Sequence, residues 1–347
     1  MTHITFKKIT LFLIATYVLL FIPRMVLAVT CPSVNGVITT DAGPIFANLG
    51  CTSQPTTQRV RVLKASLCTS SPSAATTLAA IGKAAAGCQV IFTSDDAAGD
   101  SVDIINGTTV NLTGSAIIPP IGTYSHLVVE INPTMATIAS NTFNAAVSDH
   151  GTAGTAEGVF GITTSRRNVT SGVFCVSQTV NINNWRSNNF AQDNSTVRCG
   201  ANLAATGAAG LTSTFMNSLE NGANVAALME DVFPTSLPGN PNMNVSLLTA
   251  TDLLATVAGI NQQGNVAKIV GVIPQTIVIT SKTESFDLLM SNTDGVGLDI
   301  NTDNYRSSAT NVAAGAATDQ LNISSFMPGV FDMRLTPVEF TGPEQGQ

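Results

Sequence analysis

The stretch that decides the fold is Val102-Asp103-Ile104-Ile105-Asn106-Gly107-Thr108-Thr109-Val110-Asn111-Leu112. It lies within a longer strand-rich region, residues 59–131. Asn106-Gly107 separates two strand-like runs, and Asn-Gly in that position is the strongest short-range signal for a β-hairpin. A type I′ turn needs a positive φ at both central residues, which these two residue types tolerate. The sequence therefore predicts two antiparallel strands that double back at Asn106-Gly107.

The segment before this hairpin, residues 59–67, also has the pattern of a strand. Its alternation of polar and apolar residues changes phase near Leu63, which predicts a β-bulge. Its charged residues, Arg59, Arg61 and Lys64, are typical of an edge strand that is protected against pairing with other chains. We therefore expect this strand at the edge of a sheet.

Other segments repeat the strand pattern along the chain. Short runs rich in β-branched residues are separated by clusters of Gly, Pro, Asn and Ser. Pro337 indicates that the last strand lies at an edge or contains a bulge. The expected strands are residues 88–92, 124–131, 159–162, 174–176, 180–182, 269–273, 277–280, 285–290, 296–300 and 331–335. Three segments, residues 73–86, 211–233 and 247–260, have apolar spacing that favours short helices.

Composition supports the same fold class. Charged residues make up 11% of the chain, against about a quarter in an average protein. A polar surface built from Thr, Ser, Asn and Gln suits strands and turns better than exposed helices. The sequence therefore predicts a mainly β protein, with one or more antiparallel β-sandwich-like domains, a few short helices and disulfide staples.

Six cysteines are spread over the first 199 residues, and an even number in an exported chain predicts three disulfide bonds. Sequential pairing is the simplest of the fifteen connectivities. It would join Cys31 to Cys51, Cys68 to Cys88 and Cys175 to Cys199. A zinc site is the competing interpretation, and the lack of a Cys-x-x-Cys pair disfavours it.

The first 28 residues have the pattern of a secretory signal peptide. Lys7 and Lys8 precede an apolar run at residues 9–22, and cleavage is predicted after Ala28. An uncleaved membrane anchor is the alternative. We expect a disulfide-rich β domain at residues 29–205, an α+β or β domain at residues 206–347, no stable membrane span after cleavage, and a secreted or extracytoplasmic location.

The charge balance is acidic. The whole chain has 15 basic and 22 acidic residues, a net charge of −7. The predicted signal peptide holds Lys7, Lys8 and Arg24 and no acid, so 12 basic and 22 acidic residues, a net −10, would remain. A chain of this charge is a poor partner for nucleic acid or for an anionic membrane.

Two places in the sequence are weak candidates for a site. Asp95, Asp96 and Asp100 lie on one loop and could bind calcium, but EF-hand spacing is absent and a solvated turn is the favoured interpretation. Trp185 and Arg186, between Cys175 and Cys199, could stack on a sugar; covering a disulfide or the end of a core is the favoured role.

No catalytic motif for a serine hydrolase, zinc protease or nucleotide-binding enzyme occurs, and no cofactor is predicted. His126 and His150, the two histidines after residue 28, have no motif around them, and His126 is expected to be an ordinary strand residue.

The leading hypothesis is an exported, non-enzymatic surface or extracellular structural protein. It would be adhesin-like, or a filament or coat subunit that contacts itself or another surface protein through sheet edges. A secreted hydrolase that uses carboxylates and a periplasmic binding module for a small ligand are the alternatives.

Overall fold

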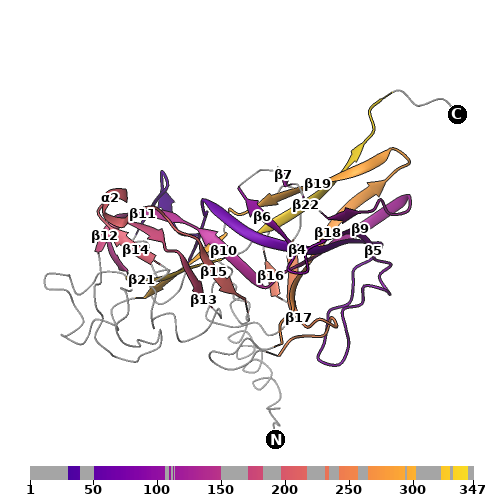
Figure 1. The fold of residues 1–347 in the computed structure, drawn as a ribbon, viewed down its shortest axis with the longest axis horizontal. Coiled ribbons are helices and arrows are strands. Elements are labelled where there is room, and N and C mark those ends of the chain that lie inside the picture. The colour runs from indigo at the N-terminus through magenta and orange to yellow at the C-terminus, as the bar shows by residue number, and fades with distance from the viewer. Residues whose placement is uncertain are drawn as a thin grey trace, which may run out of the picture.

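The computed structural model describes residues 30–39, 51–105, 109–110, 112, 114–149, 171–182, 197–216, 231–233, 242–256, 265–293, 295–301, 322–328 and 331–342. Within these ranges the protein is mainly β, with several largely antiparallel sheets and one short helix, as predicted (Figure 1). The three disulfide bonds have the predicted sequential pairing.

An eight-stranded sheet forms the left part of the molecule in Figure 1. Its main order is β1-β2-β11-β21-β20-β3, and β12 and β14 extend it from β11. The strands are β1 (Ser33–Val34), β2 (Val37–Ile38), β3 (Cys51–Ser53), β11 (Ser140–Asp149), β12 (Ser171–Ser177), β14 (Val197–Gly200), β20 (Val296–Asn301) and β21 (Asn322–Pro328).

An eleven-stranded sheet has the order β13-β15-β10-β4-β9-β18-β17-β16, with β5 and β6 paired to β4 and β8 paired to β5. The strands are β4 (Thr57–Cys68), β5 (Gln89–Thr93), β6 (Asp100–Ile104), β8 (Ser115–Ala116), β9 (Gly122–Ile131), β10 (Thr134–Ile138), β13 (Val180–Ile182), β15 (Thr212–Phe215), β16 (Asp231–Phe233), β17 (Met243–Leu248) and β18 (Lys268–Ile279).

A three-stranded sheet has the order β22-β19-β7, with β7 (Thr109–Val110), β19 (Thr283–Ser291) and β22 (Asp332–Glu339). The helix is α2 (Leu203–Thr206), which begins after Asn202, whose side chain accepts a hydrogen bond from the N–H of Ala205. An asparagine in this position satisfies one of the free N–H groups of the first turn.

The three-stranded sheet packs on one face of the eleven-stranded sheet. Alternate residues of β9, Leu127, Val129 and Ile131, share a buried cluster with Leu288 of β19 and Leu335 of β22. The opposite face of β9 and β18 is also buried, because Val128 and Val270 pack under two loops. A separate buried cluster lines the eight-stranded sheet. Two sheets face to face with apolar residues between them form a sandwich-like arrangement.

The strand β4 is an interior strand, and our prediction that it lies at an edge was wrong. It pairs with β9 and β10 on one side and with β5 and β6 on the other. Its charged residues are explained by ion pairs instead, since Arg59 contacts Asp103 and Arg61 contacts Asp96. The predicted bulge at Leu63 is confirmed, because the register of β4 against β9 shifts between Val62 and Lys64.

The predicted hairpin at residues 102–112 was wrong. β6 pairs with β4 in the eleven-stranded sheet, whereas β7 pairs with β19 in the three-stranded sheet. Asn106 and Gly107 themselves lie outside the described residues. The two strand-like runs exist, but the chain carries them from one sheet to the other.

The three expected helices were also wrong where the structure describes them. Residues 73–86 contain bends and turns, β15 occupies residues 212–215, and β17 occupies residues 243–248. Four consecutive residues of β17, residues 245–248, are buried, so the strand lacks the alternation that marks a half-exposed strand. Its apolar residues therefore resembled a helical stripe.

Both large sheets combine strands from either side of residue 205. β9 pairs with β18, and β3 pairs with β20, so the predicted domain boundary does not coincide with a boundary between sheets.

Some predictions fall outside the described residues, namely the signal peptide, Trp185, Arg186, His150 and the expected strand at residues 159–162. Among the helices of the described part, none has the length and apolar character needed to span a bilayer.

Candidate functional site

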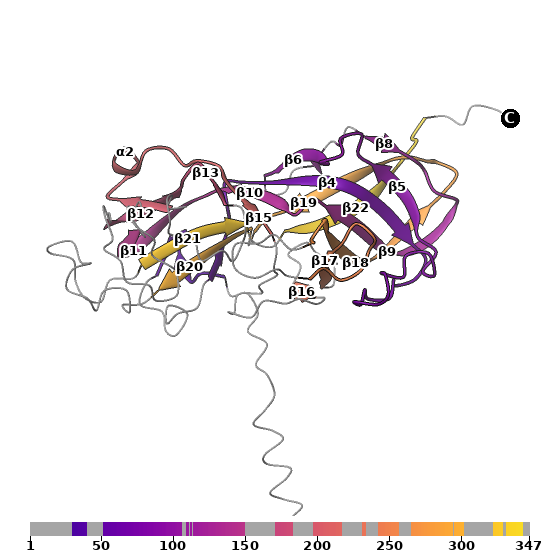
Figure 2. The ribbon, with the colours of Figure 1, turned by 60° about the horizontal axis from the view of Figure 1, so that its bottom comes forward.

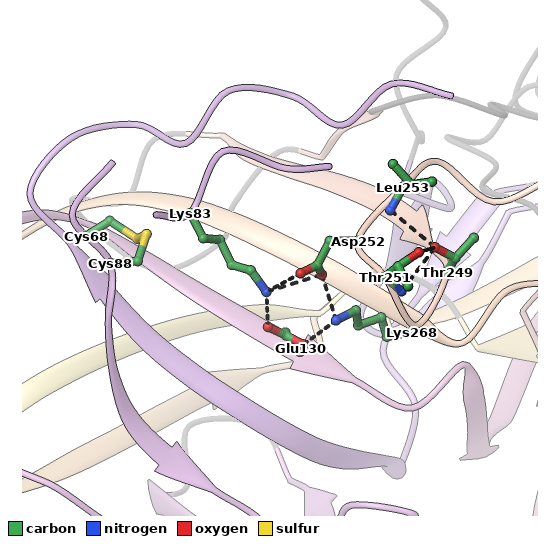
Figure 3. Close-up of polar contacts among 9 residues, drawn as sticks. All are labelled: Cys68, Lys83, Cys88, Glu130, Thr249, Thr251, Asp252, Leu253 and Lys268. Atoms are coloured by element: carbon green, nitrogen blue, oxygen red, sulfur yellow. Dashed lines mark hydrogen bonds and ion pairs between the residues drawn. A yellow bond between two sulfur atoms is a disulfide. The ribbon is translucent and has the colours of Figure 1, made fainter. Parts of the chain in front are cut away.

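Four charged side chains from distant parts of the sequence meet on the outer face of β9 and β18 (Figure 3). Glu130 lies on β9 and Lys268 begins β18, while Lys83 and Asp252 lie on two loops that cover this face. We call these four residues the ion-pair ring. Residues 69–87, which carry Lys83, are called the strap.

The ring is closed, because each acid contacts both lysines. Lys83 Nζ lies 2.6 Å from Glu130 Oε1 and 3.0 Å from Asp252 Oδ2. Lys268 Nζ lies 2.8 Å from Glu130 Oε2 and 2.6 Å from Asp252 Oδ1. The side chains range in exposure from 5% for Glu130 to 23% for Asp252. Two positive and two negative charges therefore neutralise each other in a mostly buried position.

The strap is fastened at both ends of its path over the sheet. The disulfide between Cys68 and Cys88 closes its base, and Ile81 and Ala86 pack against Val128 of β9. It also joins the loop at residues 249–256, since the N–H of Ile81 donates to the carbonyl of Asp252 at 3.0 Å.

A tight turn positions Asp252. The hydroxyl oxygen of Thr249 accepts hydrogen bonds from the N–H groups of Thr251 and Leu253, at 3.3 and 3.2 Å (Figure 3). Asp252 has a φ of +66°, a left-handed conformation that Asp tolerates better than most residues. The turn therefore directs a carboxylate toward two lysines at a small backbone cost.

Electrostatics keep the ring ionised. Burial raises the pKa of Glu130 and of Asp252, but hydrogen bonds and charges from Lys268 and Lys83 outweigh burial, and both pKa values are lowered. Burial lowers the pKa of Lys268, but Asp252 and Glu130 raise it by more. A general acid needs a raised pKa to carry a proton near neutral pH. The two carboxylates are thus arranged to hold loops, and neither is arranged as a general acid.

The candidate calcium loop uses its carboxylates internally. Asp96 accepts a hydrogen bond from the N–H of Ala98 at 2.8 Å, and Asp100 accepts one from the hydroxyl of Ser94 at 2.6 Å. Asp95 lies 3.4 Å from the hydroxyl of Ser115. In the part of the chain that the structure describes, no group of three Asp, Glu, His or Cys side chains converges as metal ligands would.

His126 lies half-buried on β9 beside Cys68 of β4. Its Nδ1 is 2.8 Å from the hydroxyl of Ser125, and that hydroxyl also donates to the carbonyl of Thr69. Burial lowers the pKa of His126. The bond from Ser125 of β9 to Thr69, the first residue of the strap, is a further link between the strap and the sheet.

Sequence reasoning missed all four members of the ring, Lys83, Glu130, Asp252 and Lys268. The position of Glu130 could have indicated a buried charge, because the other four residues of the segment 127–131 are all apolar. A carboxylate in such a strand is rarely buried unless it is paired. Its partners come from up to 138 residues away, a separation at which no local pattern identifies them.

Comparison with protein families, with curated proteins and with solved structures found no match to this chain. The functional argument therefore depends on the geometry of the described residues.

Proposed function

We propose that this chain is an exported, non-enzymatic structural protein of a cell surface or extracellular assembly, which associates with copies of itself or with another surface protein. The closed ion-pair ring carries this choice over a carboxylate-dependent hydrolase. It is the most buried cluster of charges described, and all four charges serve to hold the strap and the loop at residues 249–256 on the sheet.

The disulfide framework supports export. Three bonds close loops of 20, 20 and 24 residues, and such bonds persist in oxidising compartments. Each short closure is worth about 3 kcal/mol in the chain-entropy description. A secreted structural protein gains from this stabilisation, because it must stay folded without the chaperones of the cytosol.

The surface supports association more than catalysis. Apolar side chains are exposed at Leu78, Ile117, Ile118, Ile121 and Phe340. Contiguous exposed apolar patches often mark contact sites for other proteins, whereas single exposed apolar residues are ordinary. The neighbouring Ile117, Ile118 and Ile121 are therefore the stronger support. Sheet edges are a further candidate contact, although the side chain of Gln275 covers part of the edge of β22.

The test is fractionation of the source cells followed by mass mapping without reduction. We expect the chain outside the cytoplasm, beginning after residue 28, with all six cysteines oxidised. The purified protein should form oligomers in sedimentation experiments at high concentration. A reduced cytosolic protein, or a monomer that turns over a glycoside or peptide substrate, would contradict the proposal.

A further inference from the structure

Residues 115–118 form an exposed edge of the eleven-stranded sheet, which we call the β8 edge. On one side β8 pairs with β5, where Ala116 lies opposite Phe92, and the N–H of Ile117 continues this pairing by donating to the carbonyl of Ile91 at 2.9 Å. Residues 115–118 are all exposed. Among the described strands, β5 alone pairs with β8, and Figure 2 shows β8 beside β5 at the upper rim of the sheets.

Two residues of the β8 edge direct their backbone groups outward. In an antiparallel pair, the N–H and C=O groups of successive residues point alternately toward and away from the neighbouring strand. Because Ile117 bonds to β5, the groups of Ala116 and Ile118 point away from it, and no other described residue forms a hydrogen bond with them. An edge of this kind can accept a further strand.

The β8 edge lacks the usual protection against strand addition, which is a charged side chain, a proline or a covering group. Residues 115–118 include no charged residue and no proline, whereas Gln275 covers part of the edge of β22. The side chains of Ile117 and Ile118 are 58% and 38% exposed, and Val90 of the neighbouring β5 is 40% exposed. The open backbone groups are therefore accompanied by contiguous apolar side chains.

The length of the β8 edge favours a second copy of this chain as the added strand. Pro120, the next residue that would point outward, has no N–H, and its carbonyl already accepts from the hydroxyl of Tyr124 at 2.9 Å. A longer foreign strand would leave its own backbone groups unpaired opposite Pro120, at a cost. A second copy avoids this cost, because its chain bends at Gly114, which would lie opposite Pro120.

We infer that two copies of this chain pair through the β8 edge, antiparallel, with a two-fold axis at Ile117. This inference rests on the proposed function and specifies its contact. Ala116 of each copy lies opposite Ile118 of the other, and each of these pairs exchanges both N–H···O bonds. The exposed side chain of Ile117 is covered by its own counterpart. The contact is isologous, so it closes as a dimer and joins the eleven-stranded sheets of the two copies.

The charges next to the β8 edge are compatible with this arrangement. Asp95 accepts a hydrogen bond from the hydroxyl of Ser115 at 3.4 Å, and the adjacent Asp96 is paired with Arg61. In the antiparallel register Ser115 lies opposite Pro119 of the other copy. The two Ser115 residues are then four positions apart, about 14 Å at the usual rise of a strand. Salt screens charges over about 10 Å, so the two Asp95 carboxylates repel each other only weakly.

A second group of charges lies past the other end of the β8 edge. These residues follow Ile279, which pairs with Gly122, so they are next to a part of the chain that the proposed register leaves unpaired. They are Lys282, Glu284 and Glu339. The contact therefore consists of backbone hydrogen bonds and apolar side chains, and it does not require an ion pair between the copies.

Ile117→Cys in the full-length, oxidised protein tests the two-fold register. The described cysteines are all paired, so the introduced thiol is the one available for a new bond. Residues opposite each other in a non-hydrogen-bonded pair have Cα atoms about 4.5 Å apart, a separation that a disulfide can span. Val278→Cys is the matched control, because Val278 is 51% exposed on β18 and lies outside the β8 edge. Mild oxidation should join Ile117→Cys into covalent dimers at least about tenfold faster than the control, since pairing raises the local thiol concentration.

Ala116→Pro tests the backbone bonds. It removes an outward N–H without removing a bond to β5, so the variant should be monomeric in sedimentation velocity. The wild type should form dimers at high protein concentration, because such a short contact is weak. Ala116→Val keeps the N–H group, and this control should dimerise like the wild type.

The outcomes separate the two proposals. A wild-type protein that stays monomeric overturns both the self-association and this inference. A wild type that assembles while Ala116→Pro assembles equally well overturns the contact at the β8 edge and leaves the proposed function intact. Cross-linking of Ile117→Cys that is no faster than that of Val278→Cys overturns it in the same way, and this second result does not depend on whether the proline variant folds.

Discussion

The side chain of Gln275 on β18 bonds to the backbone of Leu335 on β22 through two hydrogen bonds. Its Nε2 donates to the carbonyl of Leu335, and its Oε1 accepts from the N–H of Leu335 at 3.1 Å. Gln275 is available because it lies in a bulge, where the register of β18 against β9 shifts between Pro274 and Ile277. The amide thus takes the place of a neighbouring strand beside β22 and joins the three-stranded sheet to the eleven-stranded sheet.

Removing this amide should loosen the contact between the sheets. Gln275→Ala leaves a partly buried N–H and carbonyl of Leu335 without partners, which we expect to lower the free energy of unfolding by about 1–3 kcal/mol. Denaturation by urea measures the change. Thr276→Ala is the control, since Thr276 is exposed in the same bulge. Equal stability of both variants would show that water replaces the amide without cost.

Pro337 protects the rest of the same edge. β22 pairs with β19 in a register that places Leu335 opposite Leu288 and Pro337 opposite Phe286. Two residues apart on a strand, Leu335 and Pro337 direct their backbone groups to the same side, which is the side away from β19. Proline has no N–H there, so the predicted edge position is confirmed and the edge offers one donor fewer to a foreign strand.

Pro337→Val restores that donor. Because no bond to β19 is involved, we expect the free energy of unfolding to change by less than about 1 kcal/mol. Aggregation detected by an amyloid-binding dye should become faster, since an unprotected edge strand can pair with another chain. Unchanged aggregation kinetics would mean that the amide of Gln275 alone is sufficient to protect this edge.

The ion-pair ring predicts a large cost for a single substitution. Glu130→Gln leaves Lys83 and Lys268 facing each other with one acid, in a site where Glu130 is 5% exposed. Breaking a buried ion pair from one side costs about 3–5 kcal/mol. Asp103→Asn is the control, because the Arg59–Asp103 pair is 41% and 43% exposed and such pairs contribute about 1 kcal/mol or less. Similar losses in both variants would contradict a role for the ring in holding the strap.

The ring also predicts how stability depends on pH. The pKa values of Glu130 and Asp252 are lowered in the folded protein from the ordinary 4.5 and 3.8. At a pH between the folded and the unfolded pKa values, the unfolded chain binds more protons than the folded protein. The contribution of the two carboxylates to the free energy of unfolding is therefore complete above the ordinary pKa values, and it is lost as the pH falls through the lowered pKa values. The free energy of unfolding should therefore decrease as the solution is acidified below about pH 5.

Glu130→Gln should flatten this acid slope, and denaturation curves at several pH values measure it. Repeating the series at about 1 M salt screens exposed pairs such as Arg59–Asp103, while the buried ring keeps its contribution. At alkaline pH, Lys268 determines the change, because its pKa is raised in the folded protein. Its contribution to the free energy of unfolding is complete below the ordinary lysine pKa, and it is lost as the pH rises through the raised pKa of Lys268. An acid slope that Glu130→Gln leaves unchanged would contradict the electrostatic description of the ring.

The sequence predicted the strands that show an alternating pattern over part of their length, including β9, although both faces of β9 are covered. It failed where a short strand shows no alternation or where pairing is distant. Residues 59–67 show the first case, with the bulge at Leu63 placed correctly from the phase change alone. β17 shows the second, because buried residues on both faces remove the alternation. Asn106-Gly107 is a local turn signal, and it contains no information about which sheet accepts each flanking strand.

The site was less predictable than the fold for the same reason. Disulfide pairing followed from the short spacing of consecutive cysteines, since short loops bring their ends together at the lowest entropic cost. The ion-pair ring joins residues 83, 130, 252 and 268, and only the completed sheet brings them together. A lone glutamate in an apolar strand predicts that a partner exists without identifying it.

The disulfides should differ in their resistance to reduction. Cys88 is half-buried, whereas Cys31, Cys51, Cys175 and Cys199 are all buried, and attack by a thiolate requires access to a sulfur. We therefore expect a mild reductant to open the bond between Cys68 and Cys88 first. Timed alkylation followed by mass mapping identifies the order in which cysteines become labelled.

Opening this bond alone should leave the protein folded at neutral pH, because the ion-pair ring and the packing of Ile81 still hold the strap on the sheet. In the Glu130→Gln variant the same treatment should release the strap, which limited proteolysis within residues 69–87 would detect as a new cleavage. If the bond between Cys175 and Cys199 opens first, or if the strap is cut equally fast in both proteins, then neither the exposure of Cys88 nor the ring controls how the strap is held.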